Sequence, residues 1–181
     1  EELLAGNQEL AGKVRFLKAD VNELRLGSGL FDVIFMTDII EHLHPGELAA
    51  AFGKALEALK PGGRLIAHTA PNSWFCLYGW PVVRRIVLLK ERLLGTLNPV
   101  PVIHHSMTGI NEKVHVNLQN PPGLKNALKS AGFAQVSIFF REEGPLEGRS
   151  AWNAALNRLF HSPGLEVFFN ISIFAAAKTD E

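Results

Sequence analysis

The chain has 181 residues, of which 47% are hydrophobic and 20% charged, and its 18 basic and 18 acidic side chains cancel. This composition predicts one globular domain with a substantial core. Because the chain has no net positive charge, binding of a nucleic acid through overall basicity is excluded. The single cysteine, Cys76, excludes an internal disulfide. Since no leader-like segment opens the chain either, the sequence favours a cytoplasmic protein.

The first half of the chain predicts alternating strands and helices. Residues 14–18 and 31–36 indicate strands, and the second is almost continuously apolar, as is typical of a parallel strand covered by helices on both faces. Apolar residues then recur at helical spacing over 46–60, until Pro61-Gly62-Gly63 ends the helix. With a third strand at 64–68, the pattern favours a parallel α/β sheet built from right-handed crossovers.

The second half predicts two helices and two further strands. A helix that Asn120 caps and Gly132 ends precedes a strand at 135–140. Residues 150–160 indicate another helix. The last segment, 167–177, is apolar throughout and predicts a final strand that no crossover helix follows.

Five short motifs stand in a specific order along this pattern. They are Leu17-Lys18-Ala19-Asp20, Phe31-Asp32-Val33-Ile34-Phe35, Asp38-Ile39-Ile40-Glu41-His42-Leu43, Leu59-Lys60-Pro61-Gly62-Gly63 and Ala131-Gly132-Phe133. In this order they resemble the class I S-adenosylmethionine-dependent methyltransferases over most of residues 10–140. The resemblance implies a Rossmann-like α/β fold whose mostly parallel sheet has an antiparallel edge hairpin, with the final strand inserted beside its neighbour.

The family pattern begins with a strand, a Gly-x-Gly loop and a second strand with an acidic end, and none of these is recognisable before residue 14. We therefore expect residues 1–181 to form a single partial methyltransferase domain without the first strands. Residues 71–107 lie where the family carries substrate-recognition insertions, which predicts a substrate lid. These residues alone are expected to bind the cofactor weakly and to be inactive.

The resemblance implies S-adenosylmethionine as the cofactor and four residues that bind it. The Asp20 carboxylate would accept a hydrogen bond from the adenine amino group, and the backbone of Val21 would serve the neighbouring ring nitrogen. Thr37 and Asp38 end the next strand, where the reactive end of the cofactor would meet the acceptor. For Asp20 alone, the alternative is a cap on the turn that follows.

Two histidines are candidate catalytic residues. His42 is a candidate general base, because histidine side chains can exchange a proton near neutral pH, although His42 and Glu41 can equally orient the loop through hydrogen bonds. His115 lies near a position where the family often has a histidine on the acceptor side. Asp38, Glu41 and His42 also resemble the metal-binding triplet of quinone-ring O-methyltransferases. A Glu-His pair is widespread in the family without metal, so the predicted site contains none.

Four further residues, Asn72, Trp74, Tyr78 and Asn117, are predicted to bind the acceptor. The basic, aromatic segment 74–94 either contacts a membrane surface and an apolar acceptor or is a packed lid. The predicted function is methyl transfer to a small-molecule, sugar or lipid-linked acceptor, with O-methylation favoured. The alternative is a non-catalytic module that binds a partner or a membrane. The oligomeric state does not follow from the sequence.

Overall fold

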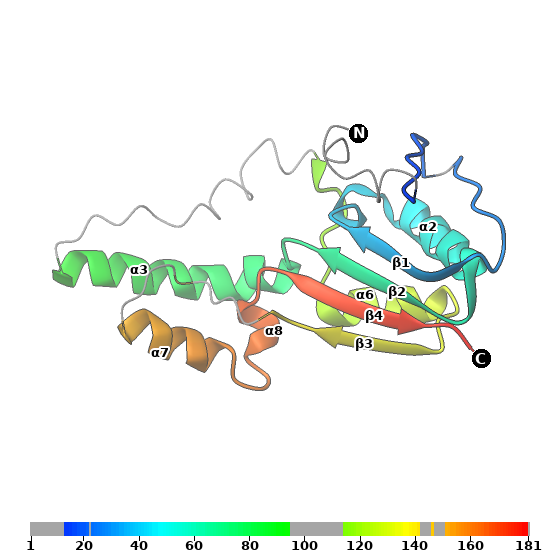
Figure 1. Ribbon diagram of the computed structural model, residues 1–181. Coiled ribbons are helices and arrows are strands. Elements are labelled where there is room, and N and C mark those ends of the chain that lie inside the picture. The colour runs from blue at the N-terminus through cyan, green and yellow to red at the C-terminus, as the bar shows by residue number, and fades with distance from the viewer. Residues whose placement is uncertain (1–12, 22, 95–113, 142–145, 147–150, 181) are drawn as a thin grey trace.

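The computed structural model describes residues 13–21, 23–94, 114–141, 146 and 151–180 (Figure 1). Within them, four strands form one mixed sheet in the order β1-β2-β4-β3. The strands are β1 (Phe31–Thr37), β2 (Leu59–Thr69), β3 (Gln135–Phe139) and β4 (Ile173–Lys178). β1 runs parallel to β2, and β4 runs antiparallel to both β2 and β3. This arrangement confirms the predicted fold, with the final strand inserted into an antiparallel edge hairpin.

Three predicted helices are present as α2 (Pro45–Ala58), α6 (Pro121–Ser130) and α7 (Ala151–Phe160). The side-chain oxygen of Asn120 accepts a hydrogen bond from the Gly123 backbone at 2.8 Å, as expected of an N-cap. Gly62 has φ +72°, and a Cβ on Gly63 would lie 2.8 Å from the carbonyl oxygen of Lys60. Glycines at both positions therefore allow the irregular backbone near the start of β2, where its register with β1 shifts.

The main hydrophobic core lies on one face of the sheet. Helices α2 and α6 pack there against alternate strand residues, including Met36, Leu65 and Ala175. On the other face Val33 and Phe35 are 43% and 69% exposed. The prediction that helices cover both faces of residues 31–36 is therefore wrong for the described part of the chain, in which the helices bury only one.

Two predicted strand segments differ from the structure. Residues 14–18 belong to no strand, and Phe16 and Leu17 are about 60% exposed, because no described strand pairs with them. In the last segment, Glu166–Phe169 forms the short helix α8 and only Ile173–Lys178 is extended. A continuous apolar run does not distinguish a strand from a buried helix, which accounts for the second error.

A second hydrophobic cluster lies beyond the end of the sheet. It joins the π-helical turn η3 (Phe75–Gly79) and helix α3 (Trp80–Leu94) to α7 and α8. In Figure 1, α3 extends away from the sheet, with α7 below it. A Cβ on Gly79 would lie 2.1 Å from the carbonyl oxygen of Phe168, so only glycine allows η3 to approach α8 this closely. Among the described residues, none of the helices combines the length and hydropathy that a bilayer span needs.

Candidate functional site

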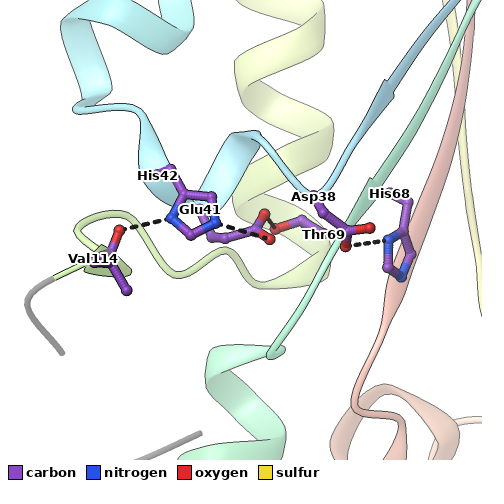
Figure 2. Close-up of polar contacts among 6 residues, drawn as sticks. All are labelled: Asp38, Glu41, His42, His68, Thr69 and Val114. Carbon is purple, nitrogen blue, oxygen red and sulfur yellow. Dashed lines mark hydrogen bonds and ion pairs between the residues drawn. The ribbon is translucent and has the colours of Figure 1, made fainter. Parts of the chain in front are cut away.

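Polar side chains gather where β1 and β2 end. Asp38 directly follows β1 and has φ +54°, in the left-handed region that few residue types other than glycine adopt. This conformation directs its carboxylate to His68 of β2, with 2.9 Å between Oδ1 and the imidazole Nδ1 (Figure 2). The backbone of Asp38 also donates to the carbonyl of His68. The end of β1 is thus joined to β2 by both main chain and side chain.

Glu41 is a buried carboxylate in the short 3-10 helix η2 (Ile40–His42). It is only 2% exposed, and Thr69, at the end of β2, is fully buried. The Thr69 hydroxyl donates to Oε2 of Glu41 at 2.7 Å. A charge-assisted hydrogen bond of this kind offsets part of the cost of burying the carboxylate and fixes its orientation.

His42 lies beside Glu41 with both ring nitrogens in defined surroundings. Its Nδ1 is 2.9 Å from the carbonyl oxygen of Val114 (Figure 2). Because a carbonyl only accepts, Nδ1 carries the proton in this contact and Nε2 keeps its lone pair in the neutral ring. Nε2 lies 3.9 Å from Oε1 of Glu41. His42 therefore presents a basic nitrogen next to a carboxylate.

The segment before α6 brings His115 and Asn117 to the same place. The His115 ring lies 4.9 Å from the His42 ring, centroid to centroid. The backbone of Asn117 donates to the carbonyl of Glu41 at 3.1 Å, and its side-chain oxygen accepts from Gln119 at 2.7 Å. His42, His115 and Asn117, predicted separately from distant parts of the sequence, thus share one site. His68, Thr69 and Gln119 were not among the predicted site residues, although His68 ends a predicted strand and Thr69 directly follows it.

A groove of about 280 Å³ opens beside β1, and its lining is mostly apolar. Val21 and Thr37, both predicted to bind the cofactor, line it together with Ile34, Met36 and Ile39. The amine of Lys54 donates to the carbonyl of Val21 at 3.0 Å and fixes the segment that follows Asp20. An apolar groove lined by the residue that follows Asp20 fits a nucleoside, because the ring of a nucleoside is flat and its edges are polar.

Asp20 itself forms a turn beside this groove. Its carbonyl accepts hydrogen bonds from the backbone of Glu23 and Leu24 at 3.1 and 2.9 Å, and its side chain is exposed. The turn that the sequence analysis offered as an alternative is therefore present. It involves the main-chain carbonyl of Asp20, so the predicted role of the carboxylate remains a prediction.

The other predicted acceptor residues lie at the second hydrophobic cluster. Asn72 is fully buried, and its amide donates to the carbonyls of Val167 and Asn170 while accepting from the Trp74 backbone. Trp74 stacks on Phe168 with the ring centroids 5.3 Å apart. Tyr78 meets the same ring edge-on at 5.9 Å and is 57% exposed. These contacts give Asn72 and Trp74 structural partners, and the acceptor-binding role of all three stays a prediction.

A family model described as a methyltransferase domain matches residues 6–138. No curated protein matches the chain. Three similar solved structures are a possible exported protein from Bordetella parapertussis, an O-methyltransferase family protein from Burkholderia thailandensis, and human N-acetylserotonin methyltransferase in complex with S-adenosylmethionine.

The three structures show the same fold at low sequence identity. The Bordetella protein has a TM-score of 0.60 and 14% identity, the Burkholderia protein 0.53 and 18%, and the human enzyme 0.52 and 12%. The matches cover 98–99% of this chain but only 48%, 40% and 37% of the respective structures, so it spans less than half the length of each. Since the family model covers well over half of the chain, the chain belongs to the methyltransferase domain family.

Proposed function

We propose that the chain is part of an S-adenosylmethionine-dependent methyltransferase that methylates an oxygen of a small-molecule, sugar or lipid-linked acceptor. The observation that carries the proposal is the cluster of Glu41, His42 and His115 at the end of β1, close in sequence to the groove that Thr37 lines. A cofactor groove and a proton-accepting cluster at one strand end are what methyl transfer to a hydroxyl needs.

The groove residues have a defined role in this proposal. Bound there, S-adenosylmethionine would supply a methyl group on a sulfonium, a good leaving group in an in-line displacement. Val21, Ile34 and Ile39 would enclose the nucleoside, with the Asp20 carboxylate accepting from its amino group. Thr37 and Asp38, at the end of β1, would position the reacting end. The described residues contribute one side of such a site, which fits weak binding by these 181 residues alone.

His42 is the proposed proton acceptor. The Val114 carbonyl holds the proton on Nδ1, so Nε2 is available to accept one from an acceptor hydroxyl. Glu41 would stabilise the resulting imidazolium, because Oε1 lies 3.9 Å from Nε2. The ring of His115 packs 4.9 Å away and would limit the directions from which an acceptor can approach.

A second proposal concerns the surface of helix α3. Tyr78, Val82, Leu89 and Leu93 recur at helical spacing and are 39–72% exposed. Arg84, Arg85 and Arg92 are also exposed on this helix. An apolar stripe with basic residues around it is typical of a surface that adsorbs to an anionic membrane. Such a contact would bring a lipid-linked acceptor to the site, or serve a non-catalytic binding module.

Calorimetry with S-adenosylmethionine tests the first proposal. We expect weak binding by the 181-residue chain and tight binding by a protein that includes any upstream residues of the gene. In the longer protein, Asp20→Ala should weaken binding about tenfold, as expected for loss of a hydrogen bond to a specific group. Asp32→Asn is the matched control, because Asp32 lies at the opposite end of β1 and pairs with Lys60.

Two outcomes would contradict this assignment. Equally tight binding by the 181-residue chain would mean that the cofactor contacts lie elsewhere. Absence of binding by both proteins would favour the non-catalytic module, and the membrane surface of α3 would then be the function to pursue.

A further inference from the structure

Three side-chain atoms of types that bind metal ions lie close together at η2, just after the end of β1. They are a carboxylate oxygen of Glu41 and one ring nitrogen each of His42 and His115, all within 4.8 Å of one another. Glu41 and His42 belong to η2, while His115 comes from the segment before α6. The fold therefore assembles this cluster from two distant parts of the chain.

Two of the three groups are already oriented by a second partner. His42 donates through Nδ1 to the Val114 carbonyl, which leaves the Nε2 lone pair free. Glu41 accepts the Thr69 hydroxyl on Oε2, which leaves Oε1 free. The two remaining atoms face each other at 3.9 Å. Hydrogen bonds of this kind, made by the far atom of each ligand, are a general feature of protein metal sites.

The third group lacks a partner where one is expected. Nδ1 of His115 is buried and has no hydrogen-bond partner among the described residues. A buried polar atom without a partner is costly, and such atoms are rare in folded proteins. A cation bound between the three side chains is one way to satisfy an imidazole nitrogen at this position.

We propose that Glu41, His42 and His115 bind a divalent transition-metal ion of the zinc class, with one coordination position left open. Two imidazoles and one carboxylate suit Zn²⁺ or Co²⁺, whereas Mg²⁺ prefers an all-oxygen set. Zinc ligands lie at about 2.0–2.2 Å from the ion, so the side chains must close by on the order of 1 Å on binding. Glu41 and His42 need only small rotations, because 3.9 Å already separates their free atoms.

The ligand set differs from the triplet considered in the sequence analysis. There the third member was Asp38, but the structure directs the Asp38 carboxylate to His68 at 2.9 Å. His115 takes its place in the cluster. If the proposed methyl transfer holds, the open position would bind the acceptor oxygen. Nε2 of His42 would then be a ligand in the metal-bound protein, and the proton acceptor proposed above in the metal-free protein.

Titration with Co²⁺, whose visible spectrum reports coordination, tests the metal site without any methyl transfer. The protein is the 181-residue chain without an affinity tag, freed of metal by a chelator. We expect one equivalent to bind and to give the absorption of a four- or five-coordinate ion. His42→Gln and His115→Gln should each weaken binding at least tenfold. Asp38→Asn, the matched control, should leave it unchanged.

A cysteine variant gives a signature that a structural role cannot produce. In His115→Cys, a directly bound thiolate should add an intense thiolate-to-metal absorption band, even if the affinity falls. Circular dichroism of each variant shows whether it is folded. The proposal is overturned if the wild type binds no stoichiometric Co²⁺, if His115→Gln binds as well as the wild type, or if only Asp38→Asn loses binding. Since the assay contains no S-adenosylmethionine, these results are independent of the calorimetry above.

Discussion

Asp38 and His68 form a side-chain pair across the ends of two parallel strands, and the pair depends on an unusual backbone conformation. The carboxylate lies 2.9 Å from the imidazole, and Asp38 has φ +54° in this arrangement. His68 in turn packs against Phe174 of β4, with the ring centroids 4.6 Å apart. The pair thus links the loop that carries Glu41 and His42 to the centre of the sheet.

The backbone at Asp38 predicts a specific order of stability among its variants. Asp38→Val should lower the free energy of unfolding by about 1–2 kcal/mol, because a β-branched residue is strained at positive φ. Asp38→Asn should have little effect, since asparagine tolerates this conformation and its oxygen still accepts from His68. Urea unfolding of the two variants measures the difference. Equal stabilities would show that the conformation at residue 38 is not under strain.

The hydroxyl of Thr69 is expected to be essential for the buried carboxylate. Thr69→Val keeps the shape but leaves Oε2 of Glu41 without its donor, which should cost about 1–3 kcal/mol of stability. Thr69→Ser keeps the hydroxyl and is the control. Thermal or urea unfolding of both variants provides the test, and a valine variant as stable as the wild type would show that Glu41 does not depend on this hydroxyl.

The stability of Asn72 variants distinguishes a structural role of this side chain from a role in acceptor binding. Its amide nitrogen links the segment after β2 to α8 through two hydrogen bonds, to the carbonyls of Val167 and Asn170, and its oxygen accepts a third from the Trp74 backbone. Asn72→Asp should destabilise more than Asn72→Ala, because a carboxylate would face the two carbonyls to which the amide now donates. Both should lower the free energy of unfolding, the alanine variant by about 3 kcal/mol. Denaturant titration decides, and two variants of wild-type stability would favour the acceptor-binding role.

Binding of α3 to anionic membranes is expected to depend on its arginines. Arg84→Glu with Arg85→Glu should abolish most sedimentation with anionic liposomes at low salt and change little at high salt, since each basic residue contributes about 1 kcal/mol near such a surface. Lys125→Glu with Lys129→Glu changes the charge equally on α6 and is the matched control. If both double variants bind alike, or the wild type does not sediment, α3 is a packed lid.

The thiol of Cys76 should be protected from alkylation. Burial raises the pKa of Cys76 to about 11, so very little of the reactive thiolate exists at pH 8. Because the folded pKa exceeds the unfolded value of about 8.5, the thiol contributes stability below pH 8.5 that is lost as the pH rises to 11. Iodoacetamide should therefore label the chain quickly in urea and slowly in buffer. Cys76→Ala should have a flatter stability profile between pH 9 and 11.

The elements that the sequence predicted correctly are those with strong local signals. Helix α6 has Asn120 before it and Gly132 after it, and both act within one turn of the chain. The strand at 14–18 failed because a strand is defined by its neighbour, and no described strand pairs with these residues. The prediction of a strand from Val167 failed because a short apolar run fits either a strand or a short helix.

The sequence indicated some of the residues that meet at the candidate site, but not how they are arranged. His42 and His115 were identified through family resemblance, yet their packing at 4.9 Å depends on the path of the segment before α6. His68 was missed because the position of its side chain depends on the register between β1 and β2. That register pairs His68 with Thr37 and so places it next to Asp38. No local pattern in the sequence encodes that register.

The position of β4 has a consequence for how the sheet is assembled. β4 lies between β2 and β3 and pairs with both, yet it follows every other described element in the chain. During synthesis β3 therefore has none of the other described strands beside it until residues 173–178 have left the ribosome. Pairings between segments so far apart in sequence form slowly. A chain that stops before Ile173 would lose two strands from the sheet, β4 itself and the then unpaired β3, and would leave Leu65 and Ala67 of β2 beside an open edge.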